Sequence, residues 1–390
     1  MSPQDNSLSS SPEARRYQAI RYRLFFFRLF GSIAALLVFL CAGWSRALKV
    51  WLLAWREDFF LLAALYISCF LFLSFVAGLP LDIFEGFFLE HRFHLSRQTF
   101  GEWSKDLLKK SVVAFIVSLA LLESVYFFLS QFPGTWWLWA ACFWFFLSII
   151  LARIFPYAIL PLFFRVRPLE EGEVRRRILA LFGRYGVRLK DIFVLDFSRK
   201  TVKANAMVAG LGAAKRIFLA DTLLGSFSPQ EIEVVLAHEL GHYLRHDTAK
   251  LVVASLASGL FSFGLAYFLF DRFLAVFGFA GPSDVAALPL LLLILFAAGF
   301  VLLPLQNGFS RILERQADRF ALEATRATEG SPEQRRGATE AFVSMMRKLG
   351  EKNLADFSPS RGMEIFFYDH PPIAKRIRMA RAFQDAGEHI

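Results

Sequence analysis

The segment SFSPQEIEVVLAHELGHYLRHD, residues 226–247, is polar and carries three of the chain's seven histidines. Ser228 suits a helix N-cap, Pro229 suits the first helical position, and Glu231 completes a capping box. The pattern therefore predicts a helix that begins before the histidines and carries them all. Polar residues at both ends make this helix unsuited to a bilayer core, although long apolar runs precede and follow it.

His238 and His242 are four residues apart, so they lie on one face of the predicted helix, one turn apart. Two imidazoles at this spacing can both reach one zinc ion at ~2.0–2.1 Å. Glu239 lies beside the first of them, where it can deprotonate an attacking water. This is the H-E-x-x-H signature of zinc peptidases. A surface helix with merely polar histidines is the alternative, and the motif's rarity and the prepared N-cap argue against it.

A catalytic zinc site needs a third protein ligand. His246 follows His242 by one more turn, but three successive turns of a straight helix diverge, so we expect it behind the metal ligands or on the surface. The segment NGFSRILERQADRFALEA, residues 307–324, offers Glu314 as ligand and Asp318 as acceptor for a ligand's free ring N–H. Their spacing alone would favour an ordinary surface helix face.

Long apolar runs make up much of the chain, which is 56% hydrophobic and only 20% charged. A membrane span needs roughly 20 apolar residues. Six runs qualify: residues 24–44, 59–79, 111–132, 135–164, 251–270 and 286–305. The fourth contains Pro156 and Pro161, which predicts a kink, a tilt or a split into two spans.

The basic residues are unevenly placed, and the net charge is +10. They concentrate before the first run and in the loop after the second, whereas residues 131–135 carry no charge. The positive-inside rule then places both termini and the polar portions 165–250 and 306–390 in the cytoplasm. Residues 45–58 must lie outside despite three basic residues, and we expect an interfacial amphipathic piece there. No basic block interleaves with aromatics, so we expect no nucleic-acid partner.

The chain divides by composition into five parts. They are a polar basic N-terminal segment (1–23), four transmembrane helices with an interfacial loop at 80–110 (24–164), a first catalytic part (165–250), two further transmembrane helices (251–305) and a second catalytic part (306–390). The first catalytic part contains three short β-like runs at 191–197, 204–210 and 215–220. The predicted fold is therefore mainly α, with a small sheet in the catalytic portion.

HELGH, followed by NGFSRILERQAD and DHPPIAKRI, resembles the integral-membrane zinc endopeptidases called type I CAAX prenyl proteases. FFLEHRFHLSRQTFGEWSKD, IFPYAILPLFFRVRPLEEG and VKANAMVAGLGAAKRIFLADTLL extend the resemblance over most of residues 80–380. The resemblance implies six or seven transmembrane helices enclosing a chamber, with a zincin-like α+β domain on the cytoplasmic side. Eukaryotic members usually have seven spans and place the next histidine five residues after the second ligand; here His246 comes four after it.

The resemblance also implies residue roles. His238, His242 and Glu314 would bind one zinc ion per chain, Glu239 would be the general base, and Asp318 would orient a ligand. His370 and Arg376 match a C-terminal His-Pro…Arg element and would contact the transition state as catalytic residues. We expect Asn205 and Ala206 to bind an extended peptide by β-addition.

The predicted function is zinc-dependent hydrolysis of peptides or proteins that are lipidated or embedded in the membrane, with the lipid bilayer as the other partner. A bacterial inner membrane is the expected location. Three alternatives stay open: a quality-control metallopeptidase of broad specificity, an intramembrane protease of the site-2 type, and a transporter with a structural zinc. The polar flanks of the histidine helix argue against the site-2 type.

Three further ionisable residues lie outside this site. Glu123 falls in the middle of an apolar run, where a carboxylate is costly and indicates a chamber-facing position or a partner. His91 and His94 are three apart and could form a second metal site, but a loop at the membrane interface is the plainer interpretation.

Overall fold

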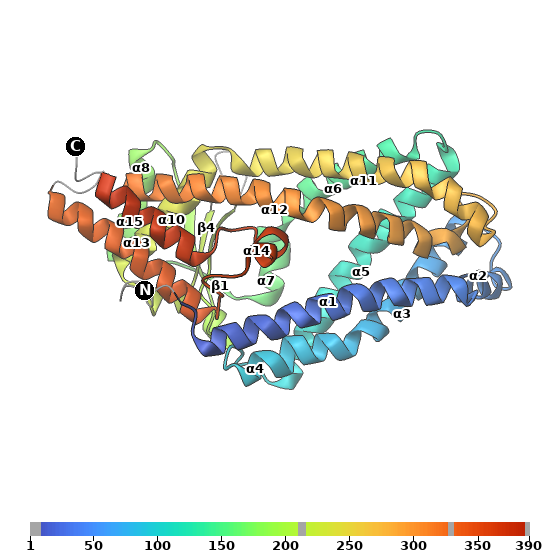
Figure 1. Cartoon of the computed structure of the whole chain (residues 1–390), viewed down its shortest axis with the longest axis horizontal. Helices are drawn as coiled ribbons and strands as arrows, with labels where there is room; N and C mark the ends of the chain where they lie inside the picture. The colour runs from blue at the N-terminus through green and yellow to red at the C-terminus, as the bar shows by residue number, and fades with distance from the viewer. Residues whose placement is uncertain (1–8, 210–215, 327–330, 387–390) are drawn as a thin grey trace.

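The computed structural model describes residues 9–209, 216–326 and 331–386, and its longest helices run along the long axis of the molecule (Figure 1). Within these ranges, six helices are long and apolar enough to cross a membrane, as predicted. They are α1 (Pro12–Cys41), α3 (Phe59–Ile83) with its continuation, α5 (Phe100–Gln131), α6 (Trp136–Ile154) with its continuation, α11 (Asp247–Phe277) and α12 (Leu288–Arg326).

The fourth apolar run is one continuous helical stretch that changes its winding at the prolines. A π-helical turn, η3 (Phe155–Ile159), joins α6 to α7 (Leu160–Phe163). Proline has no backbone N–H, so Pro156 interrupts the regular hydrogen-bond ladder, and the wider turn absorbs the change. The run therefore forms a single span, and the alternative of two spans is not needed. α3 continues in the same way through η2 (Phe84–Leu89) into α4 (Glu90–Arg92).

The segment expected to be an interfacial amphipathic piece contains a short helix, α2 (Trp44–Leu53). Ser45 and Leu52 on one face are buried, whereas the indole rings of Trp44 and Trp51 are exposed. The Ser45 hydroxyl donates to the Ala286 carbonyl at the start of the last span, where the 3₁₀ turn η5 (Val285–Ala287) leads into α12. Outward-facing indoles are typical of a helix at a membrane interface.

A four-stranded sheet has the order β1-β2-β4-β3. Its strands are β1 (Val166–Pro168), β2 (Asp191–Leu195), β3 (Ala206–Ala209) and β4 (Arg216–Ala220). β2 and β4 are parallel, and β1 and β3 run antiparallel to them at the two edges. The three predicted β-runs are thus strands; Gly210 and Lys215, at the ends of two of these runs, lie outside the described residues. β1 was not predicted.

The catalytic portion has its own apolar core at one end of the molecule (Figure 1). The sheet packs there with α8 (Glu173–Arg184), α10 (Pro229–Leu244), α13 (Pro332–Lys352), α15 (Ile373–Ala386) and the C-terminal part of α12. Phe182, Ile217, Leu236, Leu322 and Phe342 are almost fully buried in it. Each such side chain stabilises the fold by about 1.5–3 kcal/mol relative to exposure, so this core can hold the site rigidly.

Shorter elements complete the chain: η4 (Phe197–Arg199), α9 (Asp221–Leu224) and α14 (Arg361–Phe367). α1 begins within the N-terminal segment that was predicted only to be polar and basic. Its Tyr17 is buried, and the Gln18 amide donates to the Leu354 carbonyl over 2.7 Å. The first turns of α1 are therefore tied to the C-terminal part of the chain.

α12 joins the membrane portion to the site. Its 39 residues rise ~58 Å at ~1.5 Å per residue, about twice the hydrocarbon thickness of a bilayer. The predicted division at 305/306 falls inside this continuous helix, and α11 begins at Asp247 inside the predicted first catalytic part. The catalytic portion therefore sits directly on the ends of two membrane helices.

Candidate metal centre

α10 begins where the sequence predicts, with a complete capping box. The Ser228 hydroxyl accepts from the Glu231 backbone N–H, and the Glu231 carboxylate accepts from the Ser228 N–H over 2.7 Å. Glu231 also accepts hydrogen bonds from Lys348 and Ser344 of α13. Burial raises the pKa of this carboxyl, but the Lys348 and Ser344 hydrogen bonds outweigh it and hold the pKa below its usual value. One carboxylate thus fixes both the start of α10 and its contact with α13.

Gly241, inside the histidine motif, allows α10 to approach α12 closely. A methyl group built at this position would lie 3.0 Å from Phe320 Cδ1 and 3.3 Å from the Ala317 Cα. These contacts are tighter than ordinary van der Waals distances. The absence of a side chain at Gly241 therefore sets the helix separation that brings the two sets of polar residues together.

Three side chains from the two helices converge on one point. His238 Nε2 lies 3.1 Å from His242 Nε2 and 3.1 Å from Glu314 Oε2, and His242 Nε2 lies 3.2 Å from Glu314 Oε1. Among the residues that the structure describes, this is the one group of three potential metal ligands whose donor atoms all lie within 4.8 Å of one another. The structure thus brings together the three residues predicted as metal ligands.

A cation fits this cluster. Glu314 Oε2 is buried and, despite its distance to His238, finds no well-aligned hydrogen-bond donor among the described residues. Burial lowers the pKa of His238, but the nearby carboxylates of Asp318 and Glu314 raise it to about 9. The pKa of His242 is raised as well, because the Glu314 carboxylate outweighs burial. The surroundings therefore favour positive charge at the point where the three side chains meet.

Each histidine has a second carboxylate behind it. His238 Nδ1 lies 2.9 Å from Asp318 Oδ1, and His242 Nδ1 lies 3.0 Å from Asp247 Oδ2. A carboxylate at Nδ1 favours a proton on that nitrogen and leaves the Nε2 lone pair for a metal ion. Both Nε2 atoms face the cluster, as metal binding requires.

Asp247 was not among the residues singled out from the sequence. His246 adopts a left-handed conformation, with φ 55°, and ends α10 just before α11 begins. This sharp turn directs Asp247 back toward His242, where it is buried, while His246 itself is exposed. Asp247, and not His246, therefore lies behind the metal ligand His242. The left-handed turn that places it there could not be predicted from the sequence of this histidine-rich stretch.

Glu239 lies on α10 between the two histidines. Burial raises the pKa of its carboxyl, while the rings of His238 and His242 partly offset the effect. The Val208 backbone N–H, on β3, also favours the charged form. A carboxyl with a raised pKa beside a cation site is suited to accepting a proton and giving it back.

The C-terminal element reaches the cluster through two different contacts. His370 is half-exposed, and its Nε2 lies 3.2 Å from Glu314 Oε1. Arg376 is buried instead, and its Nε donates to Asp318 Oδ2 over 2.7 Å while Nη2 donates to Asp318 Oδ1. His370 therefore lies beside Glu314 on the exposed side of the cluster. The Arg376 guanidinium is thus paired with Asp318, which lies behind His238.

β3 lies at the edge of the sheet nearest α10. The Asn205 carbonyl accepts from the Ala220 N–H over 3.0 Å, so residue 205 faces β4. Backbone groups alternate in an antiparallel ladder, so those of Ala206 and Val208 point to the opposite edge. No strand among the described residues pairs with that edge. Of the two residues predicted to bind a peptide, Ala206 offers its backbone there, whereas the backbone carbonyl of Asn205 is already paired with β4.

The residues considered for other sites do not join this cluster. The His91 ring nitrogens each lie 2.8 Å from a backbone carbonyl, of Phe87 and of Gln98, so both are occupied. His94 lies just beyond, in a left-handed turn. Glu123 Oε2 is buried and has no hydrogen-bond partner among the described residues.

Comparison with known families covers nearly the whole chain. Residues 168–384 match the model of peptidase family M48. Residues 7–165 match a model described as CAAX prenyl protease N-terminal, five membrane helices. Within that range the described residues form the four long apolar helices α1, α3, α5 and α6 and the short helix α2.

Similar proteins come from bacteria and eukaryotes. A Bacillus subtilis protein named uncharacterized metalloprotease YhfN is 29% identical over 96% of this chain and 86% of its own length. A CAAX prenyl protease 1 homolog from Arabidopsis thaliana is 32% identical over 78% of this chain and 72% of its own. The crystal structure of S. mikatae Ste24p matches with a TM-score of 0.81 and 25% identity, over 96% of this chain and 89% of that chain.

Proposed function

The chain belongs to peptidase family M48, and we propose that His238, His242 and Glu314 hold one zinc ion at which Glu239 catalyses peptide-bond hydrolysis. The family, the membrane helices and the metal-binding cluster together make the protein a multi-pass membrane metalloendopeptidase that acts on peptide or protein substrates. The observation that carries the proposal is the convergence of both Nε2 atoms and the Glu314 carboxylate within 3.2 Å of one another.

The chemistry of the donor set supports zinc. Two imidazole nitrogens and one carboxylate are the ligands of thermolysin-type catalytic zinc sites, which keep a fourth position open for the reaction. Imidazole also disfavours magnesium and calcium, which prefer oxygen ligands. When bound, zinc supplies Lewis acidity to the scissile carbonyl and to water.

Glu239 is the proposed general base. Its carboxylate takes a proton from the water that attacks the scissile carbonyl and then passes that proton to the leaving amine nitrogen. Its raised pKa suits this return of the proton.

The substrate is proposed to lie along the free edge of β3. The backbone N–H and C=O of Ala206 point to this edge and can pair with an extended peptide, in the manner of β-strand addition. The side chain of Asn205, which is exposed, can add a hydrogen bond to the peptide. Because β3 contacts α10, which carries Glu239, a peptide bound here would pass the metal cluster.

His370 and Arg376 are proposed to have different roles: His370 contacts the reacting groups, and Arg376 acts through other side chains. His370 borders Glu314 on the exposed side and can donate to the oxyanion that develops at the scissile carbonyl. Arg376 is a positioning residue, because it holds Asp318, which in turn holds His238. This assignment replaces a direct catalytic contact for Arg376.

We also propose a location and a substrate class. The Arg/Lys asymmetry supports a metal centre on the cytoplasmic side. The similarity to a Bacillus subtilis protein over 96% of this chain supports a bacterial inner membrane. Relatives are named CAAX prenyl protease 1, so a lipidated tail is the first substrate to test. Broad turnover of membrane proteins would instead give many unrelated proteins in a substrate trap made with Glu239→Gln.

The test compares Glu239→Gln with Glu323→Gln, an exposed control on α12. Cleavage of an unstructured fluorogenic peptide and zinc content are measured on the purified full-length proteins. Glu239→Gln should keep one zinc per chain and lose at least ~10²-fold in kcat, the lower range for a general base. An active Glu239→Gln protein would refute the role of Glu239, and an inactive wild type with full zinc would refute the peptidase assignment.

A further inference from the structure

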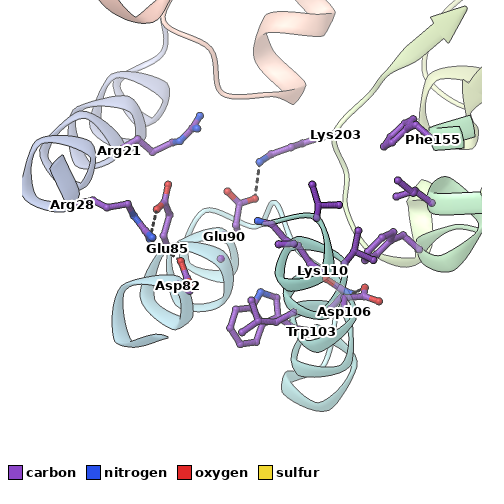
Figure 2. Close-up of a pocket in the computed structure, with 18 of the residues that line it drawn as sticks. Arg21, Arg28, Asp82, Glu85, Glu90, Trp103, Asp106, Lys110, Phe155 and Lys203 are labelled. Carbon is purple, nitrogen blue, oxygen red and sulfur yellow. Dashed lines mark hydrogen bonds and ion pairs between the residues drawn. The ribbon is translucent and has the colours of Figure 1, made fainter. Parts of the chain in front are cut away.

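A cavity of about 1080 Å³ lies between α1, α3, α5 and α6, apart from the metal cluster (Figure 2). None of the residues of the metal cluster lines it. Its volume is at the upper end of the range for sites that enclose a whole small molecule. The proposed peptidase chemistry assigns no role to it.

The wall of this cavity changes from charged to apolar. Figure 2 shows Arg21, Glu90, Lys110 and Lys203 gathered around one part of it. The other part is formed by side chains of the membrane helices α5 and α6, among them Val113, Val117, Leu151 and Phe155. Along α5, Lys110 and Val117 are separated by ~10 Å at ~1.5 Å per residue. Polarity therefore falls along the helix axis, as it does from a lipid headgroup to its acyl chains.

The carboxylates of the charged wall are all paired. Asp82 and Glu85 contact Arg28, Glu90 accepts from Lys203 and from the Tyr17 hydroxyl, and Asp106 accepts from Lys200 and Gln98.

Two cations of the same wall have no such partner. Among the described residues, neither Arg21 nor Lys110 lies within ion-pair distance of a carboxylate. Arg21 contacts the ring of Tyr17 instead, 5.7 Å from its centroid. The lining carries four basic and four acidic side chains, and Arg21 and Lys110 are the two cations that it leaves without an ion-pair partner among the described residues.

We propose that this cavity binds an anionic phospholipid of the surrounding bilayer. Its phosphate is held by Arg21 and Lys110, and an acyl chain lies against the apolar wall of α5 and α6. Charge-assisted hydrogen bonds from Arg and Lys suit phosphate oxygens. Basic pockets between membrane helices near the cytoplasmic surface are a known way of binding anionic headgroups.

A phospholipid is favoured over a peptide because the apolar wall is built from membrane-spanning helices. Val113 and Val117 belong to the third predicted span, and Leu151 and Phe155 belong to the fourth. Acyl chains of the bilayer already occupy this depth, so a lipid reaches the cavity without transferring a polar backbone into hydrocarbon.

Native mass spectrometry of the delipidated full-length protein tests this proposal. Phosphatidylglycerol and phosphatidylcholine with identical acyl chains are added separately. We expect one phosphatidylglycerol to stay bound and phosphatidylcholine to bind at least tenfold more weakly. Arg21→Gln and Lys110→Gln should each weaken phosphatidylglycerol binding about tenfold, the effect of losing one charged hydrogen bond.

Matched controls lie on the same helices but do not line the cavity. Arg23→Gln on α1 and Lys105→Gln on α5 remove the same charge and should leave lipid binding unchanged. Val117→Trp fills the apolar wall and should weaken binding while both cations remain. The melting temperature of each variant shows whether it is folded.

Four outcomes would overturn the proposal. Equal binding of the two lipids would refute the proposed headgroup site. Equal effects of the cavity variants and the control variants would refute it as well. Unchanged binding in Val117→Trp would remove the acyl-chain site. If a peptide with a free carboxyl terminus displaces the lipid and its amidated form does not, the cavity belongs to the substrate.

Discussion

At the scale of single residues, an aspartate lies beside the Nδ1 atom of each histidine ligand. Each of these aspartates accepts a hydrogen bond from a cationic side chain. Arg376 donates to Asp318, which faces His238. Lys250 donates to Asp247 over 2.8 Å, and Asp247 faces His242. At each imidazole, the carboxylate beside Nδ1 favours one ring orientation and one tautomer. Both histidines therefore have the same cation–aspartate–histidine arrangement, although the residues that form it come from different helices.

The aspartates can be tested through metal affinity. Asp247→Asn and Asp318→Asn should each weaken zinc binding by ~10–100-fold, because the imidazoles lose their orienting acceptors. Competition with a chelator measures the affinity of the purified protein. Asp271→Asn, an exposed residue on the same helix as Asp247, serves as the control. If Asp247→Asn binds zinc as tightly as this control, Asp247 has no role in orienting His242.

His370 and Arg376 should differ in what their removal costs. His370→Ala should keep its zinc and melting temperature and lose ~10²–10³-fold in kcat, with little change in KM. Arg376→Ala leaves the Asp318 charge buried without its partner, which costs about 3–5 kcal/mol, so its melting temperature and zinc content should fall. Arg378→Ala, exposed on the same helix, should change neither. A normally stable, zinc-loaded Arg376→Ala protein with low kcat would restore a direct catalytic role.

The sequence predicted the residues whose chemistry follows a regular spacing. His238, Glu239 and His242 follow helical periodicity. Placing Glu314 beside them also required the family resemblance, because a spacing of four residues is common on surface helices. Asp247 and the Arg376–Asp318 pair could not be predicted, since they depend on a left-handed turn at His246 and on the packing of α15 against α12.

At the scale of secondary-structure elements, the close approach of α10 to α12 brings the three potential metal ligands together. Gly241→Ala adds a methyl group 3.0 Å from Phe320, so the helices must separate or the ring must move. Overpacking of this kind costs about 1–3 kcal/mol, and the shift should also reduce zinc occupancy. Thermal unfolding and metal analysis measure both effects.

Gly183→Ala is the matched control, because a methyl group there meets nothing within 4 Å. That substitution lies within α8 and should stabilise the protein by up to about 1 kcal/mol, since alanine favours a helix more than glycine does. If Gly241→Ala behaves like Gly183→Ala, close helix packing does not position the ligands.

Periodicity and capping predicted most of the elements that matter. The six apolar runs and the capping box of α10 are present as expected. The extra length of α12 was not predicted, because a helix that leaves the bilayer changes composition without any break in the backbone. β1 was missed because its three residues, including Pro168, are too few to show alternation.

At the scale of the whole molecule, the catalytic portion rests on the ends of membrane helices. α10 and α11 are joined by a single turn, and α12 runs from the last span into the catalytic core. α1 is tied to the other end of the sequence through Ser10, whose hydroxyl donates to Asp356 over 2.8 Å. The metal cluster is therefore held close to the bilayer, and substrates have to reach it at the membrane surface.

Orientation can be measured directly. The proposed topology places the C-terminus in the cytoplasm and residues 131–135 outside. A green fluorescent protein fused to the C-terminus should fluoresce, and alkaline phosphatase inserted at residues 131–135 should be active. An active phosphatase at the C-terminus would invert the topology and place the metal centre on the outer side.

The central claim is a zinc ion held by His238, His242 and Glu314, and an anomalous diffraction map collected at the zinc absorption edge tests it most directly. The account predicts a single strong peak per chain, ~2.0–2.2 Å from the Nε2 atoms of both histidines and from a Glu314 carboxylate oxygen. A map from zinc-loaded, active protein with no peak at this position, or with its peak at other residues, would contradict the account.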